Sequence, residues 1–391
     1  MDISESSGLQ MLAYEAFIRR ASAVGLPFML KGSYVTRQYF PDPAMRLPND
    51  LDWIYLNVLE NEEDSRAKLD EWTTRVTELT VEDGVRFRSF QENAFWRRID
   101  YAMHDDFPTV NTDLMCWVDG EKLDWLGLDI SFNLDVEPPP VPLLYTPLRG
   151  EPFTIPYSTP IALQVAWKLH QTLVRPRFKD MFDLIYLLKH PLFDEKALGQ
   201  TWQALVNECA VDSIDISRLK YIITGELDHF YNQTTIVDAW NFWRHEIPLR
   251  NNNYYHDITY EHASRTTDVK NIPDKLKDFK EQVRYAMNHA GFDTDMLSTL
   301  PSATRAKRKS YEKQKVDVEG TVRPAAISRP ESNVGNAPIS SPGNPATFQR
   351  VEDMPEYKQL YKEARSKFFR TVLWFVLLVL MFVLVIVLLT T

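Results

Sequence analysis

Cysteine is nearly absent from this chain, because only Cys116 and Cys209 occur among its 391 residues. Two cysteines can form neither a disulfide framework nor a cysteine-based zinc site. Their scarcity fits a protein of a reducing compartment. The remaining composition, with 44% hydrophobic and 25% charged residues, is that of an ordinary globular protein.

Positive charge is also scarce in residues 1–300, where 30 Lys and Arg residues face 46 Asp and Glu residues. A general nucleic-acid binder would show a broad basic surface, so a polynucleotide substrate would need a local basic patch. The N-terminal sequence MDISESSGLQ lacks the basic and apolar regions of a secretory signal peptide. No signal peptide is therefore predicted.

Residues 372–389, VLWFVLLVLMFVLVIVLL, form the one long apolar run, with eighteen consecutive apolar residues and no charge. As a helix they would be about 27 Å long, close to the hydrocarbon thickness of a bilayer. Five Lys or Arg residues lie between positions 358 and 370, and only two threonines follow the run. The positive-inside rule then predicts a single-pass, tail-anchored membrane protein whose head is cytoplasmic.

Changes in hydrophobic pattern divide the chain. Residues 1–150 alternate helical and strand-like runs, which predicts an α/β core with a mixed sheet. From the proline cluster at residues 138–142 onward the pattern is mostly helical, so residues 151–300 predict an α-helical half. Residues 301–350 are rich in Pro, Ser, Asn and Gly and predict a disordered linker. Residues 351–371 predict a juxtamembrane helix that leads into the transmembrane helix.

Two aspartates, Asp50 and Asp52, begin the apolar run DLDWIYLNV. In a strand their side chains would point to the same side. A third acid, Asp129 in LGLDISFN, begins another strand-like run. Three carboxylates on neighbouring strands can hold two Mg²⁺ ions, which prefer oxygen ligands. The alternative is that all three acids are solvated residues at strand starts.

Gly32 and Ser33 lie between a short apolar run and a helix predicted at residues 34–39. Glycine lets a phosphate approach the backbone, and the first N–H groups of a helix can bind it. Further along, Lys168 lies in the otherwise apolar helical run IALQVAWKLH, where its ammonium must reach solvent or meet an anion. Each signal is weak alone, and their order along the chain makes the combination more specific.

The series LKGSYVTRQYF, NDLDWIYL, LDISFN and ALQVAWKLHQTLVRPRFKDMFDLIYLL resembles the AbiEii-type nucleotidyltransferase toxins of bacterial abortive-infection systems, over residues 26–188. The Gly-Ser pair and the D-x-D pair mark the wider polymerase-β-like nucleotidyltransferase superfamily. The Lys-Leu-His run followed by Lys-Asp-x-x-Asp-Leu is more specific to this branch. The resemblance implies a nucleotidyltransferase core and a helical half that face each other across a nucleotide cleft.

The same resemblance implies a role for each matching position. The nucleotide-binding residues would be Gly32, Ser33, Lys168, Lys179, Asp180 and Asp183, the metal ligands Asp50, Asp52 and Asp129, and the catalytic residues Asp50, Asp52, Asp129 and Lys168. The implied cofactor is Mg²⁺, as two ions, with Mn²⁺ as an alternative. Asp129 is also the possible base for the attacking hydroxyl. The sequence departs from the family in a longer, irregular loop between Ser33 and Asp50 and in the membrane tail.

Some of these residues also have a plain structural explanation. Asp180 and Asp183 lie near the start of a predicted helix, where acids are favourable in any case, and they could instead orient Lys168 or Arg177. Arg175, Arg177 and Lys179 form the best local basic patch for an RNA end or a nucleotide, or else a solvated loop.

Three functions are consistent with these residues. The first is Mg²⁺-dependent transfer of a nucleoside monophosphate from ATP, GTP or another NTP to an acceptor hydroxyl, with tRNA as a candidate acceptor. By resemblance the protein would be a toxin of antiviral defence with a separate antitoxin or effector partner. The second is synthesis of oligonucleotide second messengers, and the third is a membrane-tethered nucleotide sensor without turnover.

Overall fold

The computed structural model describes residues 5–99, 109–231, 236–245 and 266–298. The described residues fall into two units, of which the first holds residues 5–94 and the described residues from 109 to 298, and the second Phe95–Ile99. The described part of the second unit contains the short strand β4 (Arg97–Ile99). All elements below belong to the first unit.

Within the described residues, no helix is both long enough and apolar enough to cross a membrane. The predicted linker at 301–350, juxtamembrane helix at 351–371 and transmembrane helix at 372–389 lie outside those residues.

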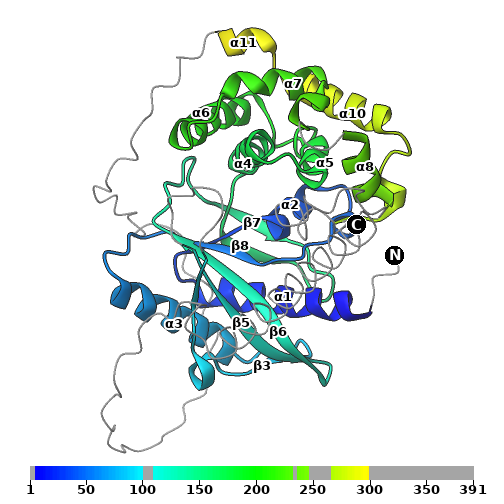
Figure 1. Ribbon diagram of the computed structural model, residues 1–391. Coiled ribbons are helices and arrows are strands. Elements are labelled where there is room, and N and C mark those ends of the chain that lie inside the picture. Colours follow the sequence, from blue (N-terminus) through cyan, green and yellow to red (C-terminus); the bar gives the residue numbers. More distant parts are fainter. Residues whose placement is uncertain (1–4, 100–108, 232–235, 246–265, 299–391) are drawn as a thin grey trace, which may run out of the picture. The chain divides into compact units, whose positions relative to one another are not determined.

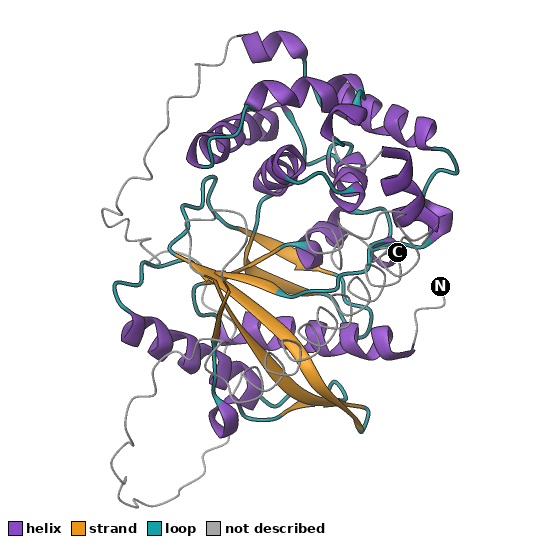
Figure 2. Cartoon of the chain, in the orientation of Figure 1, coloured by secondary structure: helices purple, strands orange, loops and turns teal. Residues whose placement is uncertain are grey.

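A mixed β-sheet organises the N-terminal part of this unit (Figure 2). Its strand order is β3-β5-β6-β2-β1-β8-β7. The strands are β1 (Phe28–Lys31), β2 (Asp52–Tyr55), β3 (Val85–Phe87), β5 (Thr109–Val118), β6 (Glu121–Phe132), β7 (Val141–Tyr145) and β8 (Phe153–Ser158). Strand β2 is antiparallel to β1 and parallel to β6, so both neighbours of β2 bring residues beside its first position, Asp52.

Helices α1 (Glu5–Val24) and α3 (Glu62–Glu78) pack against this sheet (Figure 1). Aromatic rings fill the space between them: Phe17 of α1 meets Trp53 of β2 at a centroid distance of 6.5 Å, and Trp72 of α3 stacks on Phe28 of β1 at 3.9 Å. Burying a ring such as Phe17 contributes about 1.5–3 kcal/mol. Gly25 follows α1 with a φ of 67°, the left-handed conformation of a helix C-cap.

The C-terminal part of the unit is helical. Its helices are α4 (Ile161–Val174), α5 (Phe178–Leu187), α6 (Glu195–Val211), α7 (Lys220–Thr224), α8 (Ile236–His245), α10 (Leu276–His289) and α11 (Thr294–Ser298). Phe178, the first residue of α5, packs against Trp240 and Trp243 of α8 and Phe279 of α10, with ring centroids 5.3–5.6 Å apart. This cluster fixes the start of α5, which carries several candidate site residues.

Short elements after β1 connect the sheet to these helices. They are α2 (Ser33–Thr36), η1 (Arg37–Tyr39) and η2 (Pro43–Met45). The Thr36 hydroxyl lies 3.0 Å from Oε1 of Gln164 in α4, and Phe40 stacks on Tyr186 of α5 at 4.3 Å.

The predicted α/β core followed by a helical half is confirmed, whereas the division at residues 150, 300 and 350 stays a prediction. One difference concerns the chain after the proline cluster, where the mostly helical pattern begins only after strands β7 and β8. Pro142 lies inside β7 and obscures its alternation. A proline is tolerated there because β7 is the last strand of the sheet.

Candidate active site

A tight turn at Gly32 brings two of the candidate acids to the end of β1. Gly32 has φ 77° and ψ −151°, a conformation that favours glycine. A Cβ added at Gly32 would lie 2.6 Å from Oδ2 of Asp52, so only glycine permits this approach. The hydroxyl of the next residue, Ser33, donates to Oδ1 of Asp50 at 3.3 Å. The turn therefore touches both members of the D-x-D pair.

The third acid is brought beside this pair by strand register. Asp52 of β2 is directly opposite Asp129 of β6 on one side and Lys31 of β1 on the other. Lys31 Nζ lies 3.5 Å from Oδ1 of Asp52, and the Asn111 side-chain amide donates to the carboxylate of Asp129. The Asp129 backbone N–H donates to the carbonyl oxygen of Leu51 at 3.0 Å, which fixes this pairing.

The acids affect each other's protonation. Burial raises the pKa of Asp52 from 3.8 to about 7, and the nearby charges of Asp50 and Asp129 add to this rise, whereas Lys31 opposes it. The Asp52 side chain is 18% exposed. A carboxylate that is difficult to ionise here would be stabilised in its charged form by a cation.

Among the described residues, no group of three or more His, Cys, Asp or Glu side chains stands in an arrangement that could hold a metal ion. The acids instead contact donors of the chain itself: Ser33 for Asp50, Lys31 for Asp52 and Asn111 for Asp129. Their chemistry nevertheless fits a hard divalent cation: Asp52 is paired in register with Asp129, and the Gly32-Ser33 turn contacts both Asp52 and Asp50.

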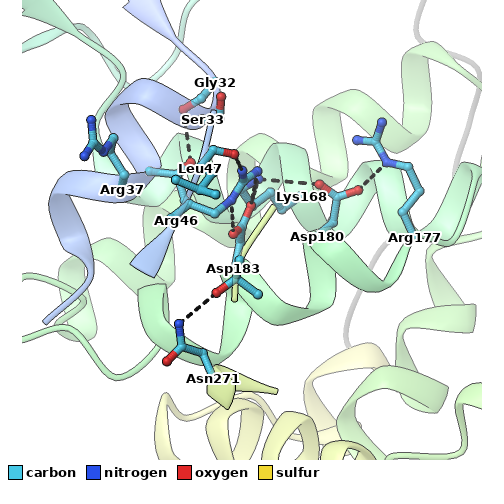
Figure 3. A network of polar contacts seen from close by, with 12 residues as sticks. Gly32, Ser33, Arg37, Arg46, Leu47, Lys168, Arg177, Asp180, Asp183 and Asn271 are labelled. Carbon is cyan, nitrogen blue, oxygen red and sulfur yellow. Dashed lines mark hydrogen bonds and ion pairs between the residues drawn. The ribbon is translucent and has the colours of Figure 1, made fainter. Parts of the chain in front are cut away.

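A second cluster of charges lies where α4 and α5 meet the loop after β1 (Figure 3). Lys168 Nζ of α4 lies 2.7 Å from Oδ2 of Asp183 and 3.5 Å from Oδ1 of Asp180. Arg177 Nε lies 2.5 Å from Oδ2 of Asp180. Arg46 forms a second ion pair with Asp183, Nε to Oδ1 at 2.7 Å.

This cluster contains more cations than anions. Asp180 is almost fully buried, which would raise its pKa, but Arg177, Lys168 and Lys179 together hold the pKa well below its ordinary value. For Lys179 the charged form is disfavoured instead. Burial and the charge of Arg177 lower its pKa, although Asp180 and Asp50 oppose this. Arg46, Lys168 and Arg177 form ion pairs with only two carboxylates, so an anion bound here would stabilise the charged form of Lys179.

The sequence-predicted residues thus fall into two groups. The structure brings Gly32, Ser33, Asp50, Asp52 and Asp129 together at the ends of β1, β2 and β6, and Lys168, Lys179, Asp180 and Asp183 together on α4 and α5. Arg46, four residues before Asp50 in the chain, forms an ion pair with Asp183 at 2.7 Å, so one short segment connects the two groups.

Three polar contacts of this site were not found from the sequence. Lys31 and Asn111 become partners of the acids through strand pairing, and Arg46 reaches Asp183 from an irregular loop. For Asn111 the sequence offers one signal, the alternation of polar residues in TVNTDLM. This alternation places Asn111 and Asp113 on the same face of the strand. No periodic pattern marks Arg46.

Replacing Gly32 by alanine tests the close approach of the turn to Asp52. The added Cβ must displace Oδ2 of Asp52 from 2.6 Å, and the positive φ adds backbone strain of about 1–3 kcal/mol. We expect a lower melting temperature in thermal unfolding. Gly120→Ala is the matched control, because Gly120 also has a positive φ, 92°, but no atom lies within 4 Å of its added Cβ. An equal fall in melting temperature in both variants would contradict the steric explanation.

Three features of this site are those of the nucleotidyltransferase class: the paired strand acids, the Gly-Ser turn beside them, and the helix that carries Lys168. The family model described as "Nucleotidyl transferase AbiEii toxin, Type IV TA system" matches residues 16–294. The chain belongs to this family, and it is a nucleotidyltransferase of the toxin type.

Solved structures give more distant likenesses. MenT4, a nucleotidyltransferase toxin from Mycobacterium tuberculosis H37Rv, is 14% identical, with a TM-score of 0.40 over 76% of this chain and 85% of that one. A putative nucleotidyltransferase from H. pylori is 15% identical, with a TM-score of 0.38 over 77% of this chain and 100% of that one. Comparison with curated protein sequences gives no match.

Proposed function

We propose that this nucleotidyltransferase uses Mg²⁺ to transfer a nucleoside monophosphate from an NTP to an acceptor hydroxyl. The acceptor oxygen forms a bond to the α-phosphorus, the bond from the α-phosphorus to the oxygen that bridges it to the β-phosphate breaks, and pyrophosphate leaves. The observation that carries this proposal is the pairing of Asp52 with Asp129 beside the Gly32 turn. Asp129 is the residue that accepts or orients the proton of the attacking hydroxyl.

The triphosphate binds between the turn and the second charge cluster in this proposal. Ser33 and the backbone at Gly32 contact phosphate, and Lys168 and Lys179 supply positive charge from α4 and α5. The lowered pKa of Lys179 supports this assignment, because burial and the neighbouring charge of Arg177 disfavour its ammonium and a bound phosphate would favour it. Asp180 and Asp183 act on the nucleotide through the cations they contact, Arg177 and Lys168.

The metal ligands in this proposal are Asp50, Asp52 and Asp129. When bound, Mg²⁺ (or Mn²⁺ in its place) would neutralise the charge that develops on the transferred phosphoryl group. The raised pKa of Asp52 supports a cation at this position, because the carboxylate lacks adequate compensation from Lys31 alone.

The family's place in a type IV toxin–antitoxin system points to an NTP as substrate and an antitoxin as partner. We propose an RNA end, such as that of a tRNA, as the acceptor. The basic patch of Arg175, Arg177 and Lys179 would guide this polyanion toward a head that is otherwise acidic. Antiviral defence through growth arrest is the corresponding biological role.

The test incubates the purified full-length chain with each labelled NTP, total RNA and Mg²⁺, and follows label in RNA. Asp129→Asn should abolish transfer, whereas Asp124→Asn on the same strand, an exposed acid paired with Lys122, should leave it unchanged. Transfer that survives Asp129→Asn would contradict the proposed site. Labelled soluble oligonucleotides formed without RNA would contradict an RNA acceptor, and NTP binding without any turnover would contradict transfer itself.

We also propose that residues 372–389 anchor the protein in a membrane with the head in the cytoplasm. Their eighteen apolar residues, preceded by five basic ones, support this. In cell fractions washed with alkaline carbonate, the full chain should stay in the membrane pellet, and a chain ending at residue 371 should be released. Release of the full chain would contradict the anchor.

A further inference from the structure

Arg46 is a buried cation in a loop that otherwise looks irregular. It lies just after η2 (Pro43–Met45), between the Gly32 turn and Asp50, and is 3% exposed. A guanidinium keeps its charge in proteins and is rarely buried without partners.

The partners of Arg46 hold its guanidinium from two sides. Nε lies 2.7 Å from Oδ1 and Nη2 lies 3.1 Å from Oδ2 of Asp183, and Nη1 donates to the carbonyl oxygen of Leu47 at 2.7 Å (Figure 3). The two parallel bonds to one carboxylate form a fork that a lysine cannot reproduce. Asp183 is therefore fixed in orientation as well as in charge.

Because the Asp183 carboxylate is fixed in orientation, it also fixes the position of Lys168. The carboxylate is fully buried, and its Oδ2 accepts from both Arg46 and Lys168, at 3.1 and 2.7 Å. Lys168 also lies 3.5 Å from Asp180, which Arg177 contacts as well, so two carboxylates face three cations and the cluster retains a surplus positive charge. The Lys168 side chain is 12% exposed, and its contacts with Asp183 and Asp180 hold its ammonium at a defined position.

The loop of Arg46 is attached to the helical half by its backbone as well. The N–H of Leu47 donates to the carbonyl oxygen of Thr266 at 2.7 Å. Three residues beyond Leu47 the chain reaches Asp50, the first of the strand acids. The same short segment thus contacts the lysine cluster at one end and leads into the acids at the other.

We propose that Arg46 is a positioning residue for nucleotidyl transfer, which acts through Asp183 to hold Lys168 in place against the triphosphate of the NTP. This rests on the proposed function, in which Lys168 contacts the triphosphate. Arg46 also fixes the spacing between Lys168 and the acids, because it ties α5 to the segment that ends at Asp50.

The test compares Arg46→Met, which keeps the length of the side chain and removes its charge, with Arg46→Lys, which keeps the charge and removes the fork. We expect Arg46→Met to raise KM for the NTP about tenfold or more, with a smaller fall in kcat, and Arg46→Lys to restore part of the loss. Arg20→Met is the matched control, since Arg20 is also buried and forked onto one acid, Asp83, at 2.6 and 3.0 Å. Arg20 packs over Phe87, against strand β3, and should leave KM unchanged even where it lowers the melting temperature.

A double-mutant cycle shows whether Arg46 acts through Lys168. Adding Arg46→Met to Lys168→Met should weaken NTP binding no further, whereas adding it to Lys179→Met should weaken binding by its full single effect. Binding is measured by equilibrium dialysis with labelled NTPs, which reports on Arg46 whether or not an acceptor is turned over. Failure of the wild-type chain to transfer nucleotide to any acceptor would overturn the proposed function alone. Unchanged NTP affinity in Arg46→Met, or losses that add with those of Lys168→Met, would overturn the positioning role.

Discussion

Asp52→Asn should remove nearly all nucleotidyl transfer and, at the same time, stabilise the protein at pH 8 in the absence of divalent cations. The activity loss follows from the proposed metal ligation by Asp52, and we expect kcat to fall about a thousandfold. The gain in stability has a separate cause. Asparagine keeps an acceptor oxygen for Lys31 and removes a charge that burial, Asp50 and Asp129 make unfavourable.

The pH dependence of this effect has a definite sign. Burial raises the pKa of Asp52 from 3.8 to about 7, so between these values the unfolded chain ionises while the folded chain keeps its proton. The free energy of unfolding contributed by Asp52 is therefore fully present below pH 3.8 and falls as pH rises through about 7. Above pH 7 the wild type carries the full cost of the charge, and the variant carries none.

Urea unfolding in EDTA at pH 4 and pH 8 measures the difference. We expect the Asn variant to match the wild type near pH 4 and to exceed it by about 1–2 kcal/mol at pH 8, less than the full shift because the side chain is 18% exposed. Asp124→Asn, on an exposed acid of β6, should change neither activity nor pH dependence. A variant that is equally stable at both pH values, or less stable at pH 8, would contradict the electrostatic explanation.

The sequence predicted the elements that carry the site because each has a strong local signal. The apolar spacing of α1, α4 and α5 and the alternation of β5 follow from residues close in the chain. Strands β7 and β8 lack such a signal because prolines interrupt them. Sheet order was equally out of reach, since β2 pairs with β6 across more than seventy residues and that pairing depends on the whole fold.

The same distinction applies to the site. The acids, the Gly-Ser turn and Lys168 are recognisable as residue types in a given order along the chain. Their partners are not, because Asn111 meets Asp129 only through the register of β5 and β6, and Arg46 meets Asp183 only when the loop folds onto α5. The irregular loop between Ser33 and Asp50 thus supplies one of the buried charges of the site.

Asp183→Asn should be the most destabilising single change at the helical side of the site. Asp183 is fully buried, and its loss leaves Arg46, which is 4% exposed, without its carboxylate partner and Lys168, which is 12% exposed, with only the longer contact to Asp180. Removing one partner of a buried ion pair costs about 3–5 kcal/mol, mostly because the remaining charge stays buried. Chemical unfolding should show this loss, and transfer should fall because Lys168 is no longer held in place.

Two further variants show whether the stability lost in Asp183→Asn comes from an uncompensated buried charge or from the loss of a contact. Asp228→Asn breaks an exposed pair with Lys280, in which Asp228 is 60% exposed, and should cost less than about 1 kcal/mol. The triple variant Arg46→Met, Lys168→Met, Asp183→Leu removes both cations with the acid, and should recover most of the stability lost in Asp183→Asn. It should remain inactive, because the triphosphate would then have lost its lysine. A triple variant less stable than Asp183→Asn would show that packing, rather than uncompensated charge, sets the cost at this position.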